Sequence, residues 1–226
     1  MSRPLALLLC ALALGLAACG DDDDSGSSGG DAPADTTRRG ACATVKQPEP
    51  KPDGGAKRRS SALDPDATYD VVLETSCGDI TIRLDQKTSP KTAASFAGLA
   101  EAGFFDGTVF HRIVPGFVIQ GGDPTATGTG GPGYSTRDVP PQDTAYTKGT
   151  VAMAKTGTEP PGTAGSQFYI VTAPDAGLPP EYALLGEVVR GQQRVDAIGK
   201  LGDPASGDAG TPLQPVVIER ATLRES

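Results

Sequence analysis

The strongest candidates for chemistry lie in one apolar stretch of the chain, residues 110–123, which reads FHRIVPGFVIQGGD. Arg112 and Gln120 are polar residues set among its aliphatic and aromatic neighbours. A lone arginine in a strand is most often an edge residue whose head group reaches solvent. A guanidinium held beside an apolar pocket is instead a fixed hydrogen-bond donor of permanent positive charge. Arg112 is therefore the first candidate for a catalytic or binding group.

The sequence contains a single histidine, His111, next to Arg112. One histidine excludes a His-rich zinc or iron site, and we expect neither a metal nor any other cofactor. A Ser/His/Asp triad would have to use His111, with Ser166 as the nucleophile. The sequence around Ser166, Gly165-Ser166-Gln167, lacks the Gly-x-Ser-x-Gly elbow of hydrolases. A hydrolase is therefore disfavoured, and we interpret His111 as structural.

The composition excludes further classes of function. The chain has 226 residues, with 20 Lys and Arg against 28 Asp and Glu, which gives a net charge of −8. A chain this acidic has no basic surface for gripping a phosphate backbone, so nucleic-acid binding is not expected. Hydrophobic residues make up 37% of the sequence, and no apolar run beyond the N-terminus is long enough to span a membrane. We therefore predict a soluble globular domain.

Residues 1–18 have the pattern of an export signal, with a basic start and an apolar run too short to be a stable membrane span. The segment Leu16-Ala17-Ala18-Cys19 resembles the lipobox of bacterial lipoproteins. This resemblance implies cleavage before Cys19, acylation of that cysteine and anchoring to the extracytoplasmic face of a bacterial membrane. The alternative is ordinary secretion with cleavage after Ala18, which would leave Cys19 free.

Residues 19–66 are predicted to form a disordered, lipid-anchored linker to a domain at residues 67–226. The only large apolar residues between Gly20 and Asp66 are Val45 and Leu63, too few to offset the entropy of ordering the segment. Of the four cysteines, Cys42 and Cys77 remain once the signal and the lipidation site are set aside. An exported pair is a plausible disulfide, and two independent thiols are the alternative.

The domain is expected to be mainly β. All five Tyr and six Phe residues lie from residue 69 onward, so the core begins there. Ser89 followed by Pro90 is typical of a helix start, and an apolar stripe then continues to a stop at Gly103. A second short helix is predicted at residues 192–201. Period-two and short apolar runs predict strands at residues 69–75, 80–84, 108–114, 117–120, 149–154, 167–171, 183–189 and 215–223.

Two blocks of sequence resemble the signatures of the cyclophilin-type peptidyl-prolyl isomerases. The first is residues 110–123, and the second is GTVAMA at residues 149–154 followed by GSQFYI at residues 165–170. The resemblance extends over residues 69–223 and implies an eight-stranded antiparallel closed barrel capped by two α-helices. It implies an enzyme that isomerises X–Pro peptide bonds, here in exported polypeptides whose folding it would assist.

The resemblance also implies the roles of individual residues. Arg112 matches the catalytic arginine, which donates to the prolyl nitrogen when the amide twists, and Gln120 would orient Arg112 and the substrate carbonyl. Phe117 would form part of the catalytic pocket. The remaining residues expected to bind substrate are Val118, Ala154, Lys155, Gln167, Tyr169, Leu178 and Tyr182.

Two positions depart from the family pattern. Tyr182 stands where many members have a pocket histidine, and Gly177 where many have tryptophan, which this chain lacks. We therefore expect weak binding of cyclosporin and retained isomerase activity, with any reduction left open. We also expect the protein to be a monomer. The alternative function is a non-catalytic peptide-binding or chaperone module using the same groove. Arg112, Phe117 and Gln120 argue against it, while Gly177 keeps it open.

Overall fold

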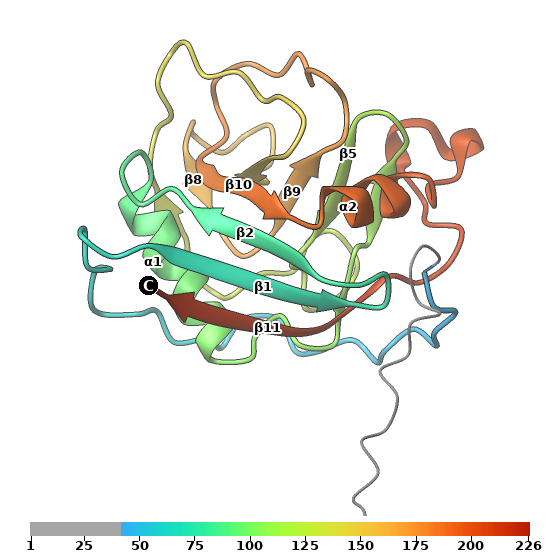
Figure 1. Cartoon of the computed structure of the whole chain (residues 1–226), viewed down its shortest axis with the longest axis horizontal. Helices are drawn as coiled ribbons and strands as arrows, with labels where there is room; N and C mark the ends of the chain where they lie inside the picture. The colour runs from blue at the N-terminus through green and yellow to red at the C-terminus, as the bar shows by residue number, and fades with distance from the viewer. Residues whose placement is uncertain (1–41) are drawn as a thin grey trace, which may run out of the picture. The chain divides into compact units, whose positions relative to one another are not determined.

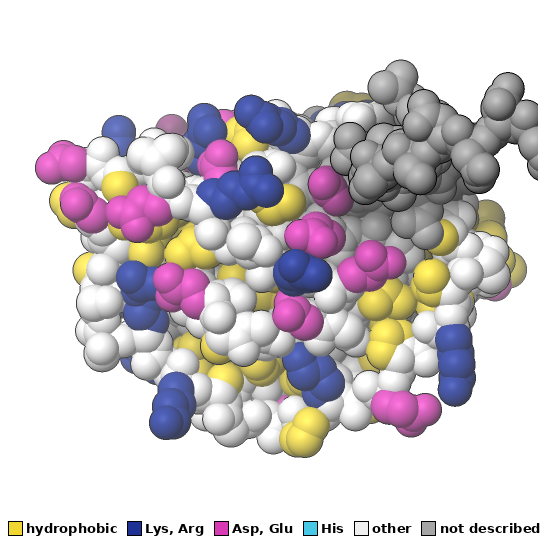
Figure 2. All heavy atoms as spheres, turned by 60° about the horizontal axis from the view of Figure 1, so that its bottom comes forward, with side chains coloured by type: hydrophobic (Ala, Val, Ile, Leu, Met, Phe, Trp, Pro, Cys, Tyr) yellow, Lys and Arg dark blue, Asp and Glu magenta, His cyan; other side chains and the backbone are white. Residues whose placement is uncertain are grey.

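The computed structural model describes residues 42–226, which form a mainly β domain (Figure 1). The expected export signal at residues 1–18 and the lipidation site at Cys19 lie outside the described residues. Within residues 42–226 the helices are too short or too polar to cross a bilayer. Figure 2 shows basic and acidic side chains interspersed over the face that lies at the bottom of Figure 1.

The core of the domain is a curled antiparallel sheet of nine strands in the order β3-β11-β1-β2-β10-β7-β9-β5-β4. The first two strands have the predicted bounds, and the others begin or end within two residues of the predicted ones. Two short strands, β6 (Thr136–Arg137) and β8 (Thr163–Ala164), pair separately. The nine strands are β1 (Tyr69–Thr75), β2 (Ile80–Leu84), β3 (Thr108–Val109), β4 (Arg112–Val114), β5 (Val118–Gly121), β7 (Thr150–Met153), β9 (Phe168–Val171), β10 (Leu184–Arg190) and β11 (Val217–Glu225).

The expectation of a closed eight-stranded barrel is wrong, and the sheet is a strongly curled half-barrel. The segment 108–114, predicted as one strand, forms two strands separated by Phe110 and His111. β3 pairs with β11, whereas β4 pairs with β5, so this short segment supplies both edges of the sheet. β3 and β4 therefore pair with different strands. Alternation of apolar residues along a segment predicts that it is a strand, but not which strand it pairs with.

Helix α1 (Pro90–Glu101) packs against the sheet. Pro90 occupies its first turn as predicted, but the side chain of Ser89 makes no cap hydrogen bond. Phe96 of this helix meets Phe168 of β9 edge to face, with ring centroids 5.4 Å apart. Helix α2 (Gln192–Gly199) ends two residues before the predicted boundary, and a 3-10 segment, η2 (Pro204–Ala209), was not predicted.

Residues 42–66 are not a free linker in this structure, and we call them the N-terminal strap. Figure 1 shows them in blue, passing below β11 in that view before the chain turns into β1. Cys42 is joined to Cys77 by a disulfide. Lys51 donates from Nζ to three backbone carbonyls, those of Gly103, Phe104 and Asp106. The expectation of disorder is wrong for residues 42–66, because backbone and polar contacts, the disulfide and the burial of Leu63 in the core together hold the strap.

Candidate functional site

Arg112 and Gln120 lie directly opposite each other in the antiparallel pair β4–β5. Side chains opposite each other in such a pair share a face of the sheet. Arg112 Nη1 lies 3.3 Å from Gln120 Oε1, and Arg112 Nε donates to the carbonyl oxygen of Asp208 at 2.9 Å. Two of the guanidinium nitrogens are thus held by the protein, and the third, Nη2, makes no hydrogen bond to residues 42–226.

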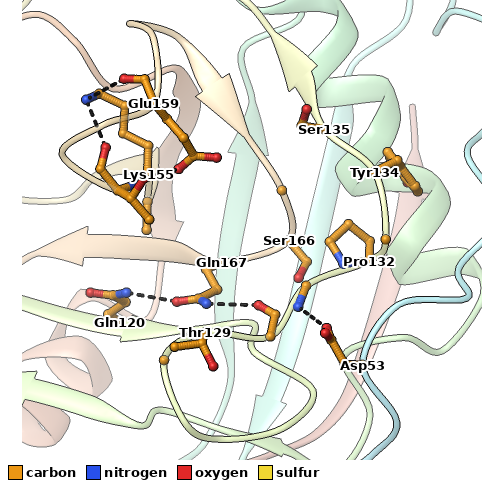
Figure 3. Close-up of a pocket in the computed structure, with 17 residues that line it drawn as sticks. Asp53, Gln120, Thr129, Pro132, Tyr134, Ser135, Lys155, Glu159, Ser166 and Gln167 are labelled. Atoms are coloured by element: carbon orange, nitrogen blue, oxygen red, sulfur yellow. Dashed lines mark hydrogen bonds between the residues drawn. The ribbon is translucent and has the colours of Figure 1, made fainter.

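Gln120 continues into a row of side-chain amides (Figure 3). Its Nε2 donates to Gln167 Oε1 at 3.0 Å, and Gln167 Nε2 donates to the carbonyl oxygen of Gly130 at 2.9 Å. The strands β5 and β9 are neighbours in the sheet, and Gln167 immediately precedes β9. The sheet therefore brings the predicted residues Arg112 and Gln120 together with Gln167, which is distant from both in the sequence.

Next to this polar row lies an apolar cluster separate from the main core. Phe117 forms one side of it, and its ring centroid is 5.9 Å from Arg112 Cζ. The guanidinium therefore lies over an aromatic ring at cation–π distance. The predicted residues Val118, Ala154, Tyr169, Leu178 and Tyr182 all belong to this cluster, together with Tyr146, Ala152, Val171, Ala173, Ala176 and Leu184.

Three tyrosines form the aromatic part of the cluster. The ring centroids of Tyr169 and Tyr182 are 5.7 Å apart, and the rings of Tyr146 and Tyr182 meet at 5.9 Å, both edge to face. Tyr146 is fully buried, and sequence reasoning missed it because it lies in a loop outside both signature blocks. Its hydroxyl donates to the carbonyl of Tyr182 at 2.7 Å and accepts from the N–H of Tyr182 at 3.0 Å.

The hydroxyls of these tyrosines have unequal surroundings. Burial raises the pKa of Tyr146 to about 12, although its hydrogen bond to Tyr182 opposes that shift. Tyr169 is only 4% exposed, and its hydroxyl has no hydrogen-bond partner among the described residues. Burial raises the pKa of Tyr169 as well, so both phenols are neutral at physiological pH.

The side chain of Lys155 folds into the protein instead of reaching solvent. Its Nζ pairs with Glu181 Oε2 at 3.1 Å, lies 5.4 Å from the ring centroid of Tyr182, and the side chain is only 3% exposed. The ammonium also approaches the carbonyls of Thr156 and Glu159, each at 3.3 Å. Lys155 thus joins the loop after β7 to the segment that carries Tyr182, on the wall of the apolar cluster.

A cavity of about 430 Å³ is lined in part by Gln120 (Figure 3). The glycine-rich loop, residues 128–135, forms one wall, and Ala154, Lys155 and Gln167 contribute to another. Asp53 of the strap also lines this cavity. Gln120 therefore contacts Arg112 through its Oε1 atom and also lines this cavity.

His111 is half-buried and lies next to Gly128 of the glycine-rich loop. Both of its ring nitrogens are without a hydrogen-bond partner among residues 42–226. Burial lowers the pKa of His111, and the charge of Arg112 lowers it further, whereas the charge of Asp123 and the neighbouring Gln167 side chain partly oppose the shift. The imidazole is therefore neutral near pH 7, which fits a structural residue.

The arrangement has a close match among known proteins. A family model described as "Cyclophilin type peptidyl-prolyl cis-trans isomerase/CLD" matches residues 70–223, which is most of the chain. The chain belongs to the cyclophilin family. Peptidyl-prolyl cis-trans isomerase A of Mycobacterium tuberculosis is 41% identical over 177 residues, an alignment covering 70% of this chain and 94% of the relative. Peptidyl-prolyl cis-trans isomerase B of Streptomyces anulatus is 42% identical over 171 residues, covering 68% and 95%.

Solved structures agree with this membership of the cyclophilin family. A cyclophilin type isomerase from Cryptosporidium parvum superposes with a TM-score of 0.62 at 29% identity, covering 70% of this chain and 98% of that one. The same protein was also solved in the presence of the dipeptide Ala-Pro, with a TM-score of 0.61. This chain is therefore a peptidyl-prolyl cis-trans isomerase. The matched range begins at residue 70, so the strap lies outside it.

Proposed function

We propose that Arg112 catalyses X–Pro isomerisation by donating a hydrogen bond from Nη2 to the prolyl nitrogen. Amide resonance sets a rotational barrier of about 18–20 kcal/mol. When the C–N bond twists, the nitrogen regains a lone pair that can accept a hydrogen bond. A donor fixed at this position binds the twisted state more strongly than the planar one, which is what acceleration requires. The observation that carries the proposal is the guanidinium of Arg112, which Gln120 and Asp208 hold over the Phe117 ring.

The apolar cluster would bind the proline ring. Phe117, Val118, Tyr169 and Leu178 supply the apolar contacts, and the reaction needs no covalent intermediate. A thousandfold acceleration requires a difference of only about 4 kcal/mol, which one charge-assisted hydrogen bond with desolvation can supply. Backbone groups near Ala154 and Lys155 would hold the main chain of the peptide.

The substrates we propose are proline-containing polypeptides outside the cytoplasm. Residues 1–18 would direct export, and acylation of Cys19 would anchor the protein to the extracytoplasmic face of a bacterial membrane. The Cys42–Cys77 disulfide supports this proposal, because disulfides persist in oxidising compartments. Weak cyclosporin binding is also proposed, because Gly177 offers no side chain to the groove. A tryptophan there would be strained, since Gly177 has φ of 62°.

The test is the rate of cis–trans exchange in a short X–Pro peptide, measured by NMR for the full-length chain and for Arg112→Ala. We expect the wild type to accelerate exchange and the variant to lose most of that acceleration while remaining folded by circular dichroism. The strap must be present in the protein tested, because Asp53 of the strap lines the cavity next to Gln120. If Arg112→Ala isomerises as fast as the wild type, the proposed role of Arg112 is wrong.

The same measurement tests the alternative, a groove that holds peptides without accelerating them. Peptide binding without faster exchange in the wild type would support that alternative. The hydrogen bonds that orient Arg112 favour the catalytic role, since a binding module needs no fixed donor at the prolyl nitrogen.

A further inference from the structure

A row of hydrogen bonds leads from Arg112 out of the apolar pocket. Arg112 donates to Oε1 of Gln120, Gln120 donates to Oε1 of Gln167, and Gln167 donates to the carbonyl oxygen of Gly130. Every donor in this row points away from Arg112. The orientation of each amide therefore depends on the next acceptor along the row.

The row continues through the backbone to the strap (Figure 3). The carbonyl of Gly130 and the N–H of Gly131 belong to one peptide group, and Gly131 N donates to Asp53 Oδ1 at 2.8 Å. This peptide group accepts from Gln167 on one side and donates to Asp53 on the other. Hydrogen bonds aligned in one direction polarise one another, and an ionised carboxylate is a strong final acceptor.

The strap holds Asp53 in place by backbone contacts on either side. Gly54 N donates to the carbonyl of Gly131 at 2.9 Å, and Ala56 N donates to the carbonyl of Pro132 at 3.1 Å. Lys51 N donates to the carbonyl of Pro124 at 2.8 Å. Asp53 therefore meets the glycine-rich loop at a defined point.

The amide groups of Gln167 and Gln120 need such an anchor. A glutamine side chain carries a donor and an acceptor of nearly the same shape, so either end can face a neighbour. If Gln167 reversed, its NH2 group would face Gln120, which would then turn its own NH2 group toward Arg112. Two donors would meet, and the guanidinium would lose the acceptor that orients it.

We propose that Asp53 is a positioning residue of the isomerase, acting on Arg112 through the Gly130–Gly131 peptide group, Gln167 and Gln120. The strap is then part of the active site, although it lies outside the residues matched by the family model. This inference rests on the proposed role of Arg112. Its test therefore includes a measurement that does not depend on isomerase activity.

The experiment compares three variants of the full-length chain. Asp53→Ala removes the final acceptor, and Asp53→Asn keeps an oxygen that can accept from Gly131 N. Glu49→Ala removes an exposed carboxylate from the same strap and serves as the matched control. The readouts are kcat and KM for an X–Pro peptide, and the NMR signals of the side-chain amides of Gln120 and Gln167 and of Arg112 Nε–H.

For Asp53→Ala we expect kcat to fall about fivefold with KM changed less than about twofold, because the lost orientation acts on the twisted state. The Gln120, Gln167 and Arg112 signals should shift in the same variant. Asp53→Asn should restore most of kcat and of the wild-type signals. Glu49→Ala should leave kcat and the NMR signals of Gln120, Gln167 and Arg112 unchanged.

Unmoved Gln120, Gln167 and Arg112 signals in Asp53→Ala would overturn the proposal, whatever the activity. Equal losses of kcat in Asp53→Ala and Glu49→Ala would overturn it too, because a general charge effect would then suffice. If Arg112→Ala keeps full activity while the signals shift in Asp53→Ala, the hydrogen-bonded row stands but positions nothing catalytic. That result overturns the functional inference separately from the row itself.

Discussion

Cys42 is linked to Cys77 across 35 residues of sequence, which fastens the start of the N-terminal strap to the turn between β1 and β2. A cross-link of this span restricts the unfolded chain, so Cys42→Ser should lower the free energy of unfolding by about 3 kcal/mol. The measurement is urea denaturation of both proteins under oxidising conditions.

The control for this prediction is chemical reduction. Dithiothreitol should lower the stability of the wild type to that of Cys42→Ser and leave the variant unchanged. Equal stabilities of the oxidised wild type and the variant would show that the cross-link contributes nothing to the free energy of unfolding.

Tyr169→Phe should stabilise the protein. The hydroxyl of Tyr169 is buried without a partner among the described residues, and an unsatisfied buried polar group costs about 1–3 kcal/mol. Phenylalanine keeps the ring that contacts Tyr182, so we expect the free energy of unfolding to rise by about 1 kcal/mol. The melting temperature and the isomerase rate of the variant check this prediction. A lower melting temperature would mean that the hydroxyl has a partner in solution.

Tyr146→Phe should have the opposite effect. Here the hydroxyl satisfies both the carbonyl and the N–H of Tyr182. Its removal leaves two part-buried backbone groups unpaired, so the free energy of unfolding should fall by about 2 kcal/mol. Denaturation curves for the two Tyr→Phe variants form a matched pair, and the same sign of change in both would refute the assignment.

The strands could be predicted where local pattern decides them. β1 and β2 have the predicted bounds because apolar residues recur along short runs bounded by turn residues. The split of 108–114 could not be predicted, since it depends on pairing with β11 and β5. The strap was missed for a related reason. Its contacts, such as Lys51 Nζ with three carbonyls, use polar groups whose partners are distant in the sequence.

The site was predictable as far as the motif reaches. The residues expected around Arg112 do lie together, because neighbouring strands carry them. Tyr146 and Asp53 were missed, since each lies outside the signature blocks and reaches the site through tertiary packing. The side chain of Lys155 could not be placed either, because its burial depends on Glu181 in a separate loop.

Stability should fall in mild acid because of His111. Burial holds the pKa of His111 below its ordinary value of 6.5 in the folded chain. As the pH falls through about 6.5, the unfolded chain takes up a proton that the folded chain does not, and stability declines by at most about 1.4 kcal/mol per pH unit. At pH values well above 6.5, the contribution of His111 to the free energy of unfolding is constant.

Any histidine contribution to this decline in stability must come from His111, because the sequence has one histidine. Urea denaturation at pH 7.5, 6.5 and 5.5 should show the decline in the wild type and a flatter profile in His111→Gln, even if that variant is less stable throughout. An identical slope in both proteins would assign the decline to carboxyl groups instead. The NMR titration of the imidazole provides an independent check, since a folded-state pKa at or above 6.5 would remove the cause of the decline.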